Sequence, residues 1–256
     1  MQQESKKAVI AALIANLCIS IFKFAAALIS GSSSMMAEAY HSVSDTFNQI
    51  LLLIGLKKSR RKSDADHPFG HGKEQFFWSF MVAIILFAIA GGLSIREGYH
   101  KLLHPEPITK VWLAYLAIAV AVFFETIALR MAIQSIKAEM KKEKQENFFC
   151  AIRDSKDPTT LTVLFEDSLA LAGLLIAALA ITLVQITGAL IIDAIASIVI
   201  GTLLMVFAFF LGFETKKLLI GEGISALKRK QIIEAVNFFD EVERVIRLKS
   251  MHLSSD

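Results

Sequence analysis

Four polar side chains fall at helical spacing near the start of an apolar segment: Glu38, His41, Asp45 and Asn48, with Gln49 directly after the last. Positions three or four residues apart lie on one face of a helix, so a carboxylate, an imidazole, a second carboxylate and an amide share a single stripe. Ionisable side chains at bilayer depth are costly and usually face a bundle interior or a water-filled cavity. The stripe is therefore either a polar contact that holds helices together or half of a metal or proton site that another helix completes.

A second pair of acids, Glu166 and Asp167, lies in a later apolar segment. Adjacent residues on a helix diverge by about 100°, so we expect one acid to face the helix of His41 and the other a neighbouring helix or the membrane entrance. A single acid could pair with a buried cation, for which Lys23 and Arg130 are the main options. A divalent metal ion is the simpler counter-charge, and a shared proton would serve in its absence.

A third group follows the second apolar segment, where Asp64, His67 and His71 stand in a charged loop. Two histidines four residues apart, with an acid three before the first, could share one ion if the segment turns suitably. Imidazole together with carboxylate suits zinc and similar first-row divalent ions. Histidine pairs in charged loops are also common without a ligand, so the spacing leaves metal binding and an inert loop equally open.

The elements that hold these residues are expected to be membrane spans. The chain has 256 residues, of which 55% are hydrophobic, and its mean hydropathy is +0.56. This is too apolar for an ordinary soluble domain. Six segments are long enough to cross a hydrocarbon core of about 30 Å, and backbone in lipid must bond internally, so we expect six helices. They cover approximately residues 8–30, 35–56, 75–97, 111–134, 160–184 and 188–213.

Basic residues indicate which loops are cytoplasmic. They gather before the first span, after the second, after the fourth and after the sixth, whereas the opposite loops carry only Arg96, Lys101 and Lys110. By the positive-inside bias, both termini are expected in the cytoplasm. Solvation and anionic lipid account for the basic runs, so no nucleic-acid partner is expected. Cys18 and Cys150 form no CxxC pair, which argues against a disulfide framework or a thiolate metal site.

Residues 214–256 are expected to begin a cytoplasmic domain. An amphipathic stretch runs from Ser225 to Phe239, and the residues from Val242 to His252 show the partial alternation of a strand. So short a segment could hardly bury an independent core. We therefore predict an all-α membrane protein, with a six-helix transmembrane domain over residues 1–213 and the start of a truncated α+β domain over residues 214–256.

In combination, these motifs resemble those of the cation diffusion facilitator family of metal transporters. The resemblance rests on His41-Ser-x-x-Asp45-x-x-Asn48, Asp64-x-x-His67-Pro-Phe-Gly-His71-Gly-Lys, Glu166-Asp167 with Gly173 six residues later, and Asp193-Ala-x-x-Ser197. It covers the whole chain, including the six spans and the start of the C-terminal domain. Each motif alone is weak, and together they are specific.

The resemblance implies a homodimeric antiporter, not an enzyme, that moves Zn²⁺ or a similar divalent cation out of the cytoplasm in exchange for protons. The transport site would lie between the second and fifth spans and use His41, Asp45 and Asp167. The fourth family position falls on Val163, which has no ligand atom. The missing ligand could be Glu166 after a local helix distortion, Asn48, Gln49 or water. With fewer nitrogen ligands, Mn²⁺, Fe²⁺ and Co²⁺ stay open beside Zn²⁺.

The resemblance also implies an auxiliary metal site at Asp64, His67 and His71 and places the chain, as a multi-pass protein, in a cell inner or plasma membrane. His41 is expected to carry the exchanged proton, because imidazole titrates near physiological pH. Two other readings remain: a divalent-cation pathway that is not coupled to protons, and a metal-sensing membrane scaffold. An intramembrane metalloenzyme is disfavoured because the chain has no HExxH helix.

Overall fold

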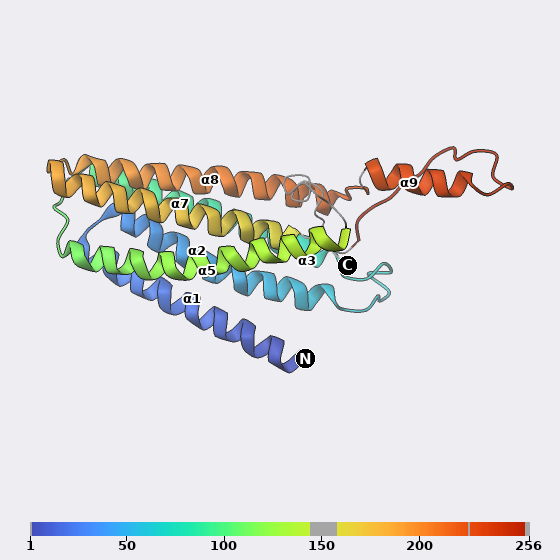
Figure 1. Cartoon of the computed structure of the whole chain (residues 1–256), viewed down its shortest axis with the longest axis horizontal. Helices are drawn as coiled ribbons and strands as arrows, with labels where there is room; N and C mark the ends of the chain where they lie inside the picture. Colours follow the sequence, from blue (N-terminus) through green and yellow to red (C-terminus); the bar gives the residue numbers. More distant parts are fainter. Residues whose placement is uncertain (1, 144–157, 225, 254–256) are drawn as a thin grey trace.

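The chain folds into a bundle of long helices, which a computed structural model describes for residues 2–143, 158–224 and 226–253. The helices are α1 (Gln2–Ser30), α2 (Ser33–Ser59), α3 (Glu74–Ile85), the π-helical η1 (Leu86–Leu93), α4 (Ser94–Leu103), α5 (Val111–Glu143), α7 (Pro158–Thr187), α8 (Ile191–Ile220) and α9 (Ala226–Asn237). The long helices run side by side, and α9 extends beyond one end of the bundle (Figure 1). The described residues contain no strand.

Five helices of the described residues are long and apolar enough to cross a membrane, which confirms five of the six expected spans. They cover Leu13–Ser30, Glu74–Leu103, Val111–Ala138, Leu164–Thr187 and Ile191–Ile220. The expected span over residues 35–56 corresponds to α2, which has 27 residues and so has the length to cross. It is less apolar than the five other spans because its polar stripe lowers its mean hydropathy.

The polar helix α2 lies inside the bundle. It packs against α1, α3, η1, α4, α7 and α8. From Ser32 to Ala39 every residue is buried, and Glu38, His41 and Asn48 are each at most 1% exposed. The polar side chains of α2 thus face the other helices, as expected for intramembrane polar residues, whereas Phe47 and Ile50 on another side of the helix are exposed.

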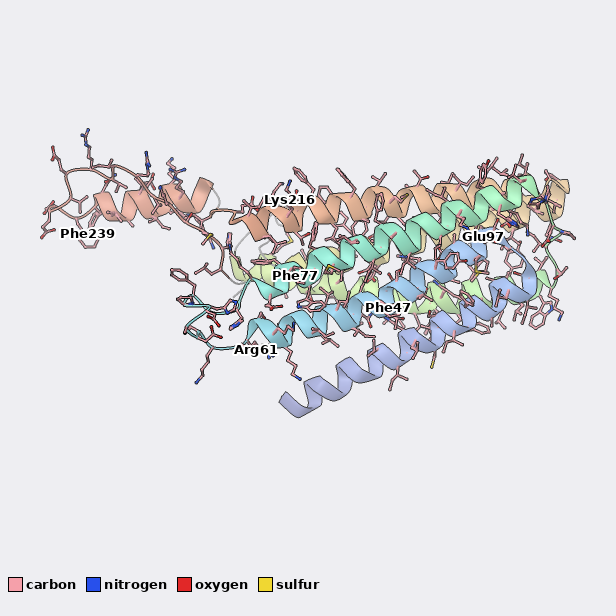
Figure 2. The ribbon with its side chains drawn as sticks, turned by 180° about the vertical axis from the view of Figure 1, so that it is seen from behind. Phe47, Arg61, Phe77, Glu97, Lys216 and Phe239 are labelled. Carbon is pink, nitrogen blue, oxygen red and sulfur yellow. The ribbon has the colours of Figure 1, made fainter. Side chains whose placement is uncertain are left out.

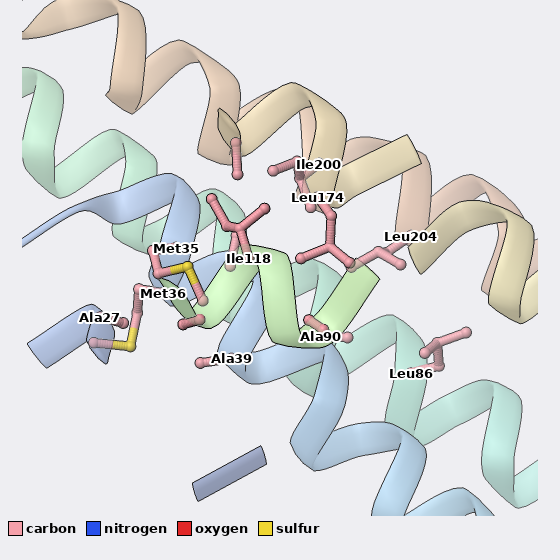
Figure 3. Close-up of a cluster of buried hydrophobic side chains, with 14 of the residues drawn as sticks. Ala27, Met35, Met36, Ala39, Leu86, Ala90, Ile118, Leu174, Ile200 and Leu204 are labelled. Atoms are coloured by element: carbon pink, nitrogen blue, oxygen red, sulfur yellow. The ribbon is translucent and has the colours of Figure 1, made fainter. Parts of the chain in front are cut away.

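The core between these helices is built from small and medium apolar side chains. Figure 3 shows Met35 of α2, Ile118 of α5, Leu174 of α7 and Leu204 of α8 among the buried side chains of this cluster. Close backbone approach completes the packing: a methyl group at Gly201 of α8 would lie 2.8 Å from the carbonyl oxygen of Gly91 in η1. Small residues at such contacts are typical of membrane helices.

A buried carboxylate joins α2 to α8 at the end of the bundle that carries Gly31, here called the Gly31 end. Asp193 of α8 accepts hydrogen bonds from the backbone N–H groups of Ser33 and Ser34 at 2.6 and 3.2 Å. It also accepts from the hydroxyl groups of Ser32, Ser33 and Ser34 at 2.7, 2.9 and 2.5 Å. A carboxylate at a helix N-terminus satisfies N–H groups that have no partner within the helix.

The residues after α8 only partly match expectation. The helix α9 lies within the predicted amphipathic stretch, but the predicted strand over 242–252 is wrong, since these residues form no strand. The segment is tied back by the backbone N–H of His252, which donates to the carbonyl of Glu222 at 2.9 Å, and by the Ser250 hydroxyl, which accepts from the N–H of Ile224 at 3.1 Å. Both chain ends lie toward the end of the bundle opposite Gly31 (Figure 1).

Candidate functional site

The stripe on α2 faces the bundle interior. His41 and Asn48 are each 1% exposed, and the side chain of Asp45 is 15% exposed. The Nδ1 atom of His41 lies 3.4 Å from Oδ1 of Asp45. Both ring nitrogens of His41 and Oδ1 of Asp45 are buried without a hydrogen-bond partner among the described residues. Buried polar atoms without partners are uncommon in folded proteins, so this group has the capacity to take a ligand.

Glu166 is the acid of α7 that faces α2. Its Oε1 atom accepts a hydrogen bond from Nδ2 of Asn48 at 2.7 Å. Its carboxyl group is also near that of Asp45, and the two groups affect each other's ionisation. Two neighbouring buried carboxyl groups disfavour both being ionised unless a cation or a proton lies between them. The helix α7 is continuous through Glu166, so this approach needs no local distortion.

Asp167 points elsewhere. It is half-buried, its Oδ2 atom has no hydrogen-bond partner in the described part of the chain, and its nearest charged neighbours are Glu125 of α5 and Glu166. The structure gives it no ion pair with His41, and the only three ligand atoms within 4.8 Å of one another among the described residues belong to the loop group, not to α2 and α7. Gln49 is half-buried beside the stripe, and the side chain of Val163 lies outside the described part.

A buried ion pair lies one helical turn from His41 toward the Gly31 end. The Nζ atom of Lys23 in α1 donates to Oε2 of Glu38 in α2 at 3.3 Å, and both side chains are 0% exposed. Sequence reasoning named both residues but did not pair them. A signal was present: α1 and α2 form a hairpin about Gly31, and Lys23 stands 8 residues before that glycine while Glu38 stands 7 after it. In a hairpin, such positions lie at similar depth.

The loop between α2 and α3 brings its three predicted ligands together. Asp64 Oδ1 lies 3.2 Å from Nδ1 of His67, and Asp64 Oδ2 lies 3.5 Å from Nε2 of His71. One ligand atom from each residue lies within 4.8 Å of the others. One carboxylate and two imidazoles, with a water as fourth ligand, form a donor set that suits Zn²⁺.

Local hydrogen bonds shape this loop. The backbone N–H of His67 donates to Oδ1 of Asp64 at 2.7 Å, and the N–H of Gly70 donates to the carbonyl of His67 at 2.9 Å. Gly70 takes a φ of +82°, a left-handed conformation that glycine adopts without strain. The backbone hydrogen bond from His67 is the main reason that the pKa of Asp64 lies below its usual value, and the His67 side chain adds to it.

The loop lies at the end of the bundle opposite Gly31. Figure 2 shows Arg61, Phe77 and Lys216 near this end and Glu97 at the other. A cavity of about 620 Å³ opens here, lined by the two loop histidines and by Leu219, Met251 and Leu253 of the C-terminal part. The loop group and the C-terminal residues therefore border one space.

Comparison with known proteins extends these observations. The family model described as "Cation efflux transmembrane domain" matches residues 9–220 of this chain. The metal tolerance protein C4 of Arabidopsis thaliana is 37% identical over 252 residues, covering 97% of this chain and 54% of that protein. The human mitochondrial proton-coupled zinc antiporter SLC30A9 is 33% identical over 247 residues, covering 96% of this chain and 43% of that protein. A manganese efflux system protein, MneP, of Bacillus subtilis is 36% identical over 89 residues, covering 35% of this chain and 30% of that protein.

The chain thus spans about half the length of the first two of these relatives. The match to the cation efflux domain runs from the first helix to the end of α8, so it includes every helix that contributes to the stripe, the acids of α7 and the loop group. The resemblance inferred from the motifs is confirmed, and the chain belongs to the cation efflux family of multi-pass membrane transporters, which are not enzymes.

Proposed function

We propose that this protein exports Zn²⁺, or a similar first-row divalent cation, from the cytoplasm in exchange for protons. The ion binds between α2 and α7, with His41, Asp45 and Glu166 as ligands and Asp167 beside them. The three ligands draw together around the ion, since their ligand atoms do not all lie within 4.8 Å of one another in this structure. The observation that carries the proposal is the meeting of Glu166 with Asp45 and Asn48, next to a buried imidazole whose nitrogens have no hydrogen-bond partner among the described residues.

Proton exchange follows from the chemistry of these ligands. An imidazole must be neutral and a carboxylate ionised to bind a metal ion, so metal and protons compete for the same atoms. When no metal is bound, the paired carboxyl groups of Asp45 and Glu166 hold a proton between them. Metal entry releases that proton, and a rocking of helices that exposes the site to the other side lets protons displace the metal.

Relatives support the choice of ion and coupling. The human relative is named a proton-coupled zinc antiporter, and the bacterial relative is named for manganese efflux. A site with one imidazole and several carboxylates suits zinc and also leaves Mn²⁺, Fe²⁺ and Co²⁺ open. We propose zinc as the first ion to test.

The membrane arrangement is part of the proposal. The helix α2 serves as the sixth span and packs against four of the five apolar spans, and both termini lie in the cytoplasm, in line with their place at one end of the bundle (Figure 1). The protein works as a homodimer in a cell inner or plasma membrane, and residues 214–256 begin its cytoplasmic domain. Because the name of the human relative places it in mitochondria, a mitochondrial membrane is the alternative.

The test is transport by the purified protein in sealed vesicles that contain a zinc-sensitive and a pH-sensitive dye. Wild-type protein should move zinc in one direction and protons in the other, and Asp45→Ala should lower both fluxes by on the order of 10- to 100-fold. Zinc flux that does not respond to an imposed pH gradient would support an uncoupled pathway. Zinc binding without any flux in wild-type vesicles would support a metal-sensing scaffold.

A matched control is Asp66→Ala, which removes a carboxylate from the exposed loop without touching the stripe on α2. This variant should transport zinc at the wild-type rate. If Asp66→Ala loses transport as Asp45→Ala does, then removing any acid impairs the protein, and the loss in Asp45→Ala is not specific to the site between α2 and α7.

A further inference from the structure

The ion pair of Lys23 with Glu38 is unusual for its depth. Both side chains are 0% exposed, whereas every other salt bridge of the described residues includes at least one group that reaches solvent or lipid. Removing two charges from water is expensive, and an apolar pair of similar size is often as stable or more stable. Stability alone therefore gives no account of this pair.

The pair lies between the site and the Gly31 end of the bundle. Toward that end, α2 is buried at every position from Ser32 to Ala39. At the level of the site, Asp45 is 15% exposed. Glu38 is thus the first charged residue of α2 on the way from the site to the Gly31 end, and it lies in a fully buried stretch of the helix.

Glu38 is only half satisfied by its partner. Its Oε2 atom bonds to Lys23, but its Oε1 atom is buried without a hydrogen-bond partner among the described residues. That oxygen lies so close to Gly173 of α7 that a methyl group there would overlap it. A carboxylate oxygen with no donor, one turn from a cation site, is a ready ligand for a cation that moves along the stripe.

Lys23 has a second acid within electrostatic reach. Glu125 of α5 lies close enough for its charge and that of Lys23 to affect each other, and the same holds for Glu125 and Glu38. An ammonium group displaced from Glu38 would therefore move toward Glu125 and not into an uncharged environment. Lys23 thus has Glu38 as its bonded partner and Glu125 as a second acid whose charge acts on it.

We propose that Lys23 and Glu38 form the gate of the cation path at the Gly31 end. Glu38 takes the exported ion as it leaves His41 and Asp45, and the Lys23 ammonium is a tethered cation that occupies Glu38 until the ion arrives. This inference rests on the proposed transport function, and it adds a specific ligand on the exit side of the site.

The test compares zinc binding with zinc transport in the paired variant Lys23→Gln and Glu38→Gln. Two amides can keep a hydrogen bond between α1 and α2 while removing both charges. We expect this variant to bind zinc with the wild-type stoichiometry and affinity but to transport it about 10-fold more slowly or worse. The control Ser20→Ala, at a buried position one turn from Lys23, should transport at the wild-type rate.

Two results would overturn the gate. One is wild-type transport by the paired variant, and the other is a loss of zinc binding in proportion to transport, which would mark a merely structural contact. If the paired variant cannot be purified in folded form, Gly173→Ala provides the test of the gate. This substitution displaces the Glu38 carboxyl group without changing a charge. Slow transport with intact binding supports the gate, and wild-type transport overturns it. Failure of the proposed function itself would be seen in wild-type vesicles, before any variant is compared.

Discussion

Asn48 of α2 orients Glu166, the acid of α7 that faces α2. Its Nδ2 group donates to Glu166 at 2.7 Å, while its Oδ1 atom is buried with no hydrogen-bond partner in the described part of the chain. The amide thus holds one carboxylate oxygen of Glu166 and leaves the other for Asp45 or a metal ion. Groups that orient a ligand in this way contribute to metal affinity almost as much as ligands do.

Replacing Asn48 with Ala should therefore weaken zinc binding between α2 and α7 by on the order of 10- to 100-fold. The physical reason is that Glu166 loses the donor that orients it. Equilibrium zinc titration of the purified protein measures this change. Thr46→Ala is the control, because Thr46 is buried on α2 but donates only to the backbone carbonyl of Ser42, at 3.0 Å. Unchanged zinc affinity in Asn48→Ala would remove the amide from the site.

The carboxyl group of the loop group should stay ionised when the pH is lowered. The pKa of Asp64 is held below its usual value by the hydrogen bond from the His67 backbone. A lowered pKa keeps a carboxylate ionised as the pH falls, so Asp64 should stay ionised, and able to bind a metal ion, down to about pH 5.

The corresponding measurement is zinc binding to the loop as a function of pH, with His41→Ala in the background to remove the site on α2. Asp64→Asn should lower zinc affinity across the whole range without moving the midpoint of the pH curve. His67→Ala combined with His71→Ala should remove one bound zinc per chain. A midpoint that shifts by about one pH unit or more in Asp64→Asn would mean that the carboxyl group itself titrates in this range.

The spacing of residues predicted part of this chemistry. Helical periodicity alone placed Glu38, His41, Asp45 and Asn48 on one face. The loop spacing of Asp64, His67 and His71 left a shared ion and an inert loop equally open, and only the family resemblance favoured the ion. Spacing could not decide between Glu166 and Asp167, because two adjacent residues differ only by the rotation of α7, which packing against α2 and α5 sets. The sequence offered Lys23 as a counter-cation for an acid of the later span, whereas its partner is Glu38, which lies at similar depth in the hairpin of α1 and α2.

At the level of elements, the position of α2 depends on a carboxylate from another helix. Asp193 of α8 accepts hydrogen bonds from the first backbone N–H groups and hydroxyl groups of α2, at the start of the same helix that carries the site. Because this contact holds the Gly31 end of α2 against α8, it should stabilise the bundle without taking part in zinc binding.

Asp193→Asn should lower the free energy of unfolding by about 1–3 kcal/mol, because the side-chain amide cannot accept on its nitrogen and leaves buried donors of α2 unpaired. Thermal unfolding of the detergent-solubilised protein measures the loss. Asp66→Asn, in the exposed loop, is the control and should unfold like the wild type. Zinc affinity should be the same in both variants, and a loss of zinc binding in Asp193→Asn with unchanged stability would assign Asp193 to the site.

Hydropathy predicted the apolar spans well because each is a long run of side chains that lipid accepts. It could not predict the π-helical segment over Leu86–Leu93, where Gly91 closely approaches Gly201 of α8, a residue distant in sequence. The predicted strand over 242–252 failed for a related reason: alternation gives a strand only where a partner strand exists, and the described residues supply none.

For the whole molecule, three groups suited to cations follow one another along α2. The loop group lies at the end opposite Gly31, the stripe with Glu166 lies within the bundle, and the Lys23–Glu38 pair lies nearest the Gly31 end. Only the middle group joins α2 to an acid of α7, so it is the one whose ligands can separate when helices move against each other. This division is what an alternating-access transporter needs.

The most direct test of the account is whether α2 and α7 share one metal ion. In a protein that carries His67→Ala and His71→Ala, so that the loop group is removed, zinc titration should still find one ion per chain. Asp45→Ala and Glu166→Ala should each weaken the binding of this ion by on the order of 10- to 100-fold. The double variant should lose less binding free energy than the sum of the two single losses. Unchanged zinc affinity in Glu166→Ala, with Asp45→Ala impaired, would contradict a site shared between the two helices.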